Sequence, residues 1–150
     1  FYTDEYVKYL KVLAKGRKNI IFTGPQTGNI LSQLFSHAYL FVQPSEAEGL
    51  SIALLEAMGC GKAVLTSDIP ENKEAIGSAG VCFRNGDKND LAKKLNYMIC
   101  NEDKVRKLGI KAWCRANEKY NWEKIARKTD EMYKSMSQNN ESVVAVAHEV

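Results

Sequence analysis

Two glutamates, Glu48 and Glu56, are separated by seven residues, and Gly49 directly follows the first of them. In an α-helix, eight residues cover about 12 Å along the axis and about 80° of rotation, so the two acids address different points. A helix that begins near Gly49 would place free backbone N–H groups and the positive end of its dipole between them, which suits a phosphate. The pattern favours an elongated ligand, with a diphosphate in the middle and hydroxyl-bearing groups at both ends. A nucleotide-diphospho-sugar has this form.

The run from Leu50 to Met58 is apolar nearly all round, so we expect a buried helix with Glu56 as a costly carboxylate inside it. The alternative for Glu56 is a buried acid that neighbouring backbone amides satisfy. The alternative for Glu48 is an N-terminal acid that the helix dipole favours. Ser51 either binds phosphate or only begins the helix.

Short apolar runs alternate with helical patterns along the first half of the chain. The expected strands are residues 19–23, 39–43, 63–66 and 80–83. The expected helices are residues 4–15, 29–36, 50–58 and 71–76, followed by 89–100, 103–119 and 122–136. This alternation predicts a parallel sheet, whose ligands bind beyond the carboxyl ends of the strands. We expect one domain over residues 1–137 and a flexible tail over 138–150.

Local signals predict how some helices begin and pack. Asp68 and Glu71 have the spacing of a capping box, and Asn121 can cap the helix that follows it. Trp122 and Tyr133 are expected to anchor the last helix in the core.

Composition excludes several classes. With 150 residues, 21 Lys+Arg, 18 Asp+Glu and a formal net charge of +3, the chain suits one globular domain and not bulk electrostatic binding of nucleic acid. No apolar run approaches the roughly 18 residues of a membrane span. The basic stretch from Lys104 to Arg127 contains acids, which favours a solvated face over contact with anionic lipid. The sequence has no Cys-x-x-Cys pair, so we expect free thiols and a cytoplasmic protein. The alternative location is peripheral contact with the inner face of a membrane.

The chain resembles the C-terminal, donor-binding half of a family 4 glycosyltransferase of the two-domain GT-B class. The resemblance covers nearly everything from Asn19 to Tyr133. It is carried by Pro44-Ser45, Glu48-Gly49, Glu56-Ala57-Met58, Gly61, Val64 and Asp68, and further by Phe22-Thr23-Gly24, Glu74, Gly86-Asp87, Leu91, Trp122 and Tyr133. It implies an α/β fold: a Rossmann-like parallel sheet with helices on both faces, the C-terminal half of a GT-B fold, followed by C-terminal helices.

The resemblance also implies retaining hexosyl transfer from a nucleotide sugar, with no cofactor and no bound metal. Glu48 would be the catalytic residue beside the transferred sugar, and Glu56 would accept hydrogen bonds from the ribose hydroxyls. Backbone N–H groups at the helix start would hold the diphosphate, and an upstream turn would border the nucleobase. These remaining donor-binding positions are Gly49, Leu50, Ser51, Gly24, Pro25 and Gln26. The acceptor, a sugar, lipid or other glycan, would bind to an N-terminal domain.

One feature of the family has no match in this sequence. The family carries an Arg and Lys pair on the first strand and loop of this domain, and no stretch before Asn19 matches it. The acceptor-binding domain is missing as well, so we expect the chain alone not to catalyse transfer. Two alternatives remain: a non-catalytic nucleotide-sugar-binding module and a GT-B-like nucleotide-sugar epimerase.

Overall fold

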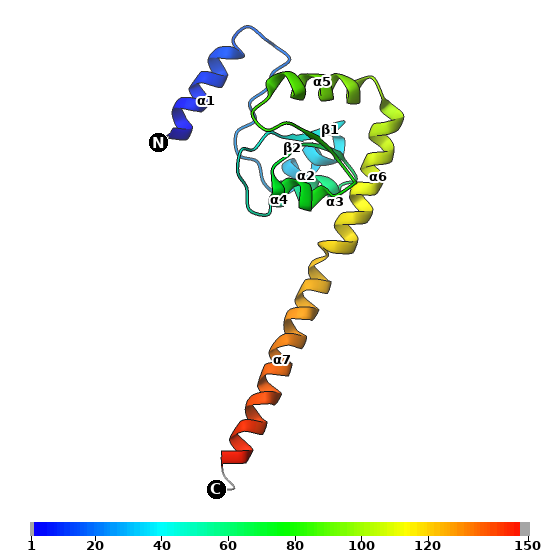
Figure 1. The fold of residues 1–150 in the computed structure, drawn as a ribbon. Coiled ribbons are helices and arrows are strands. Elements are labelled where there is room, and N and C mark those ends of the chain that lie inside the picture. The colour runs from blue at the N-terminus through cyan, green and yellow to red at the C-terminus, as the bar shows by residue number, and fades with distance from the viewer. Residues whose placement is uncertain (1, 148–150) are drawn as a thin grey trace. The chain divides into compact units, whose positions relative to one another are not determined.

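The computed structural model describes residues 2–147, with side chains over residues 4–136 (Figure 1). The chain divides into two compact units, Phe1–Ser32 and Gln33–Val150. Helix α1 (Tyr2–Leu13) lies in the first unit, and the boundary falls within helix α2 (Gly28–His37).

The second unit contains a parallel sheet of three strands, which confirms the expected fold class. Strand order follows the chain: β1 (Leu40–Gln43), β2 (Ala63–Ser67) and β3 (Val81–Phe83). Both ladders are parallel. The carboxyl ends of the strands therefore meet at one edge, where open α/β sheets bind their ligands.

Besides the end of α2, five further helices belong to the described part of this unit. They are α3 (Ile52–Gly59), α4 (Pro70–Ile76), α5 (Lys88–Ile99), α6 (Glu102–Lys119) and α7 (Trp122–Ala147). Every residue of β2 is buried, so both faces of the central strand are covered. This is the pattern expected of a nearly continuous apolar strand in a parallel sheet.

The two faces of β2 pack against different helices. Leu65 belongs to a core cluster with Met98 of α5 and Leu108 of α6. Successive strand side chains point to opposite faces, so Val64 points the other way. A Cβ added at Gly80 would collide with Val64 and with Ile76 of α4, which shows how closely that second face is packed.

Helix α6 lies directly against the turn that ends α3. A Cβ added at Gly109 would overlap the carbonyl oxygen of Gly61, so only glycine permits this approach. Gly61 itself has a φ of 69°, a left-handed conformation that glycine adopts without strain. The close contact brings the C-terminal end of α6 beside α3, and both helices line an open hollow.

The expected strand at residues 19–23 is wrong. The stretch is irregular, and its one hydrogen bond between backbone groups within the described residues joins the N–H of Ile20 to the carbonyl of Arg17 (3.2 Å). A strand exists only with a hydrogen-bonded neighbour, and the ladders of the described sheet join β1, β2 and β3 alone. Apolar composition was therefore not sufficient evidence for a strand.

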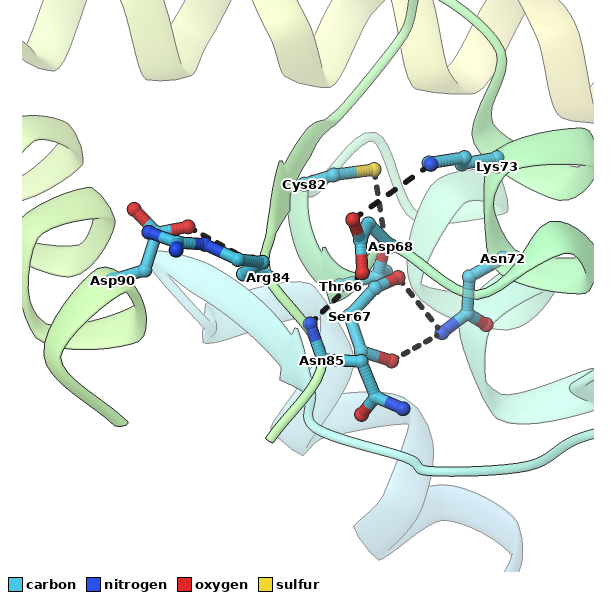
Figure 2. Close-up of polar contacts among 9 residues, drawn as sticks. All are labelled: Thr66, Ser67, Asp68, Asn72, Lys73, Cys82, Arg84, Asn85 and Asp90. Atoms are coloured by element: carbon cyan, nitrogen blue, oxygen red, sulfur yellow. Dashed lines mark hydrogen bonds and ion pairs between the residues drawn. The ribbon is translucent and has the colours of Figure 1, made fainter. Parts of the chain in front are cut away.

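The expected capping box at Asp68 and Glu71 is also wrong. The residue before α4 is Ile69, which makes no side-chain cap. The Asp68 carboxylate instead accepts a hydrogen bond from the N–H of Asn85 (2.8 Å) and pairs with Lys73 (3.8 Å), as Figure 2 shows. The Asn85 N–H, more than the Lys73 charge, holds the pKa of Asp68 below its usual range. Asp68 thus ties the end of β2 to the turn after β3.

Helix α7 begins as expected but packs differently. The Asn121 side chain accepts a hydrogen bond from the N–H of Lys124 (3.1 Å) and so caps the helix. Trp122 and Tyr133 are 76% and 70% exposed, so the expectation that they anchor the core is wrong. Aromatic residues at helical spacing indicate an apolar face, but they do not say that the face is covered.

The predicted tail begins within this helix. The backbone of α7 is helical to Ala147, so the helix includes residues 138–147 of the expected tail. The flexibility of the tail stays a prediction, and residues 148–150 lie outside the described residues. No helix in the described range is long and apolar enough to cross a membrane.

Candidate functional site

The turn between β1 and α3 holds Glu48 through one carboxylate oxygen. Oε1 of Glu48 accepts hydrogen bonds from Nε2 of Gln43 (2.9 Å) and from Oγ of Ser45 (2.7 Å). Oε2 has no hydrogen-bond partner within the described part of the chain. The carboxylate is half-buried, so one oxygen is fixed by the protein and the other is available to a ligand.

Gln43 links this carboxylate to the start of α3. Oγ of Ser51 donates to Oε1 of Gln43 (3.0 Å) and accepts from the N–H of Leu54 (3.3 Å). Ser51 is therefore the N-cap of α3, which confirms the helix-start reading of this residue. Its part in phosphate binding stays a prediction.

A second set of contacts anchors the same turn to β2 and α4. Oγ of Ser67, the last residue of β2, donates to the carbonyl of Ser45. Nδ2 of Asn72 donates to Oγ of Ser67 (3.0 Å), a contact drawn in Figure 2. Ser67 and Asn72 are fully buried, so this hydrogen bonding is shielded from water. The turn that carries Glu48 is thus attached to two neighbouring strands and a helix.

The last three residues before α3 have free backbone N–H groups. Within the described residues, the N–H groups of Gly49, Leu50 and Ser51 donate to no protein group. They precede the N-terminus of an eight-residue helix, where the helix dipole favours negative charge. This arrangement can bind a phosphate group.

Glu56 is exposed, so the expectation of a buried carboxylate is wrong. Leu54, Ala57 and Met58 are fully buried, whereas Ile52 on another face of α3 is 63% exposed. An apolar sequence all round a helix does not say which faces have neighbours. Glu56 makes no ion pair and no side-chain hydrogen bond among the described residues, and its exposed carboxylate is open to water or a ligand.

Glu56 lies in the wall of an open hollow of about 670 Å³. Leu50 and the outer face of α3, with Ile52, form one side. The end of α6 and the start of α7, with Trp122 and Ile125, form the other. The walls are mainly apolar, with few charged groups. A site of this kind can bury an apolar ring while the carboxylate binds a hydroxyl group.

The upstream turn of the predicted site belongs to the first unit. Gly24 has a φ of 65°, and Nε2 of Gln26 donates to the carbonyl of Thr23 (2.6 Å), so the turn is held locally. The role of Gly24, Pro25 and Gln26 beside the nucleobase stays a prediction. The structure brings together the other predicted positions, Glu48 to Ser51 and Glu56, on one turn and one helix.

Sequence reasoning gave no role beside Glu48 to the residues that support it. These are Gln43, Ser45, Ser67 and Asn72. A signal was present, because Gln43 and Ser67 are polar residues that end otherwise apolar strands. Within the described residues, no group of three or more His, Cys, Asp or Glu side chains could hold a metal ion.

Residues 3–113 match the family described as glycosyl transferases group 1. The chain belongs to this family. It is 36% identical over 109 residues to the sulfoquinovosyl transferase of Arabidopsis thaliana. It is 34% identical over 116 residues to the alpha-maltose-1-phosphate synthase of Mycolicibacterium smegmatis. These alignments cover 68% and 71% of this chain but 21% and 30% of the relatives, so this group 1 chain spans less than a third of their length.

Solved structures confirm the fold expected of a group 1 glycosyltransferase. HepE of Anabaena in complex with UDP-glucose matches with a TM-score of 0.80 and 25% identity, over 88% of this chain and 37% of that one. The sucrose-phosphate synthase of Thermosynechococcus elongatus matches with a TM-score of 0.82 over 90% of this chain and 34% of that one. Its 23% identity supports the fold alone. A match to about a third of each solved chain is consistent with the C-terminal domain of a GT-B fold.

Proposed function

We propose that this chain binds the nucleotide-diphospho-sugar donor of a retaining glycosyltransferase, which transfers the sugar to a separately bound acceptor. The observation that carries the proposal is the row of free N–H groups from Gly49 to Ser51, with Glu48 before it and Glu56 after it. Membership of the group 1 family supports the reaction class.

Each part of the donor has a group of matching chemistry. The N–H groups of Gly49, Leu50 and Ser51 bind the diphosphate. Oε2 of Glu48 faces the sugar, where a carboxylate can orient hydroxyl groups and stabilise positive charge at the anomeric carbon. The exposed carboxylate of Glu56 accepts hydrogen bonds from the ribose.

The hydroxyl of Ser51 has a different role from its N–H group. It already donates to Oε1 of Gln43, so it has no second proton for a phosphate oxygen. Ser51 therefore contributes its backbone N–H to the diphosphate and its side chain to the helix cap.

UDP-glucose is the first donor to test, because HepE, 25% identical to this chain, was solved with UDP-glucose. The experiment is an amide NMR titration of the chain with UDP, UDP-glucose and the corresponding GDP and ADP compounds. The proposal predicts that the largest shifts lie at Gly49, Leu50 and Ser51. If every nucleotide leaves these amides unmoved, or shifts only residues far from them, the proposal is wrong.

Three further parts of the expectation are proposals too: a cytoplasmic location, an acceptor that binds outside this chain, and no transfer by the chain alone. A radiolabelled-sugar assay of the isolated chain against the full-length protein that carries it tests the last of these. Transfer by the isolated chain would overturn it.

A further inference from the structure

We infer that Gln43 is a positioning residue: its buried amide fixes one oxygen of Glu48 and so directs the other oxygen toward the donor sugar. This inference rests on the proposed function. Gln43 is the last residue of β1 and is only 7% exposed. A buried amide without partners would be costly, so the contacts at its two ends decide what it does.

The two ends of the amide can take only one orientation. An ionised carboxylate accepts hydrogen bonds and cannot donate them, so Nε2 must face Oε1 of Glu48, at 2.9 Å. Reversing the amide would place two oxygens against each other there. Oε1 of Gln43 then needs a donor, and the hydroxyl of Ser51 supplies it at 3.0 Å. That hydroxyl proton is free for Gln43 because Oγ accepts, at 3.3 Å, from the N–H of Leu54.

Ser45 restrains the carboxylate with a second donor. Its hydroxyl reaches the same oxygen of Glu48 at 2.7 Å, and its own backbone is held by the buried Ser67. Two donors on one carboxylate oxygen restrict rotation of the group. The oxygen that remains, Oε2, is therefore presented in a defined direction before any donor binds.

Gln43 is also the shared partner of both halves of the proposed site. One end of its amide holds the carboxylate that faces the sugar, and the other end holds the N-cap of the helix that faces the diphosphate. The spacing between sugar and diphosphate is a property of the donor, so a fixed spacing between their protein partners is useful. Preorganisation of this kind lowers the cost of reaching the reactive arrangement.

The test uses two changes at Gln43 in the full-length protein that carries this chain. Gln43→Met keeps much of the volume and removes both hydrogen bonds. Gln43→Glu keeps an acceptor for Ser51 but puts a second carboxylate against Glu48. Gln33→Met, on the exposed side of α2, is the matched control. The measurements are Kd for UDP and for UDP-glucose by calorimetry, or for the nucleotide pair that the titration selects, together with kcat and KM.

The inference predicts a larger loss for the sugar-bearing donor than for UDP. In both Gln43 variants, Kd for UDP should rise less than Kd for UDP-glucose, because Ser51 keeps its own cap on the N–H of Leu54. The preference for UDP-glucose over UDP should fall, and kcat should fall on the order of ten- to a hundredfold. KM should change less than kcat, and Gln33→Met should match wild type. A role limited to stability would not change the ratio of the two Kd values.

Ser45 keeps the inference testable if changes at Gln43 prevent folding. Ser45→Ala removes the second donor, whereas Ser45→Thr keeps a hydroxyl in the same place; Ser78→Ala, at an exposed serine, is the control. The inference predicts that Ser45→Ala lowers kcat and that Ser45→Thr restores much of it. Folded variants with an unchanged UDP-glucose to UDP ratio and unchanged kcat would overturn the inference alone. A wild-type protein that binds no nucleotide sugar would overturn the proposed function together with it.

Discussion

The two acids of the proposed site are held in opposite ways. Glu48 is half-buried, and protein donors occupy one of its oxygens. Glu56 is exposed in the wall of an open hollow and makes no side-chain contact of this kind within the described residues. The difference fits the proposed roles: the protein positions in advance the carboxylate proposed to face the sugar, and it leaves free the carboxylate proposed to bind the ribose. Precise orientation of the sugar is needed where the glycosidic bond forms and breaks, whereas the contact at the ribose needs only to contribute affinity.

Replacing Glu48 should have the largest effect on turnover. Glu48→Gln keeps the shape of the side chain and removes its charge, so kcat should fall by about a hundredfold or more. Donor Kd should change only a few-fold, because the diphosphate contacts come from the backbone. Steady-state kinetics and calorimetry on the full-length protein measure both. Unaltered turnover would remove Glu48 from the reaction.

Replacing Glu56 should produce the complementary result. Glu56→Ala removes hydrogen bonds between a charged group and the ribose, so donor Kd should rise about ten- to a hundredfold. Turnover at saturating donor should change less than it does in Glu48→Gln. Glu118→Ala, an exposed acid on α6, is the control for loss of negative charge. If Glu56→Ala binds donor as tightly as wild type, the exposed Glu56 has no part in donor binding.

The support beneath Glu48 can be loosened at Asn72. Asn72→Ala removes buried hydrogen bonds to Ser67, so the free energy of unfolding should fall by about 1–3 kcal/mol. Chemical denaturation measures this loss, and kinetics should show lower kcat with nearly normal affinity for UDP. Asn96→Ala, at an exposed position of α5, should show neither effect. If the variant loses UDP binding as strongly as turnover, the support of Glu48 is not independent of the part of the site that binds UDP.

The smallest of these effects is expected from acid, which should weaken the attachment of β2 to the turn after β3. Because the pKa of Asp68 is lowered in the folded chain, its contribution to stability is present above the unfolded pKa, about 3.9. That contribution is lost as the pH falls through the lower folded value. Asp68→Ala should therefore melt below wild type at pH 7 and approach it below about pH 4. A melting difference that stays constant from pH 7 to pH 3 would contradict this.

The sheet and the turn between β1 and α3 were predictable because local signals carry them. Short, nearly continuous apolar runs between helical patterns predict buried parallel strands, and Glu48-Gly49 before an apolar helix predicts the turn. The irregular stretch at residues 19–23 was not predictable, since a strand depends on a neighbour that a local pattern does not reveal.

The environment of each acid was less accessible from sequence. The exposure of Glu56 and Trp122 depends on which helix faces are covered, and an apolar sequence is silent on that. The support of Glu48 joins residues that are distant along the chain, as in the bond from Ser67 to Ser45, 22 positions apart. Polar residues at the ends of buried strands are the general signal that such support is present.

The central claim is that a diphosphate binds before the first turn of α3, between the two acids. The most direct measurement is a crystal structure of the protein with UDP-glucose bound. The account predicts phosphate oxygens on the N–H groups of Gly49, Leu50 and Ser51, with Glu48 at the glucose and Glu56 at the ribose. A diphosphate bound elsewhere, or both carboxylates turned away from the donor, would contradict it.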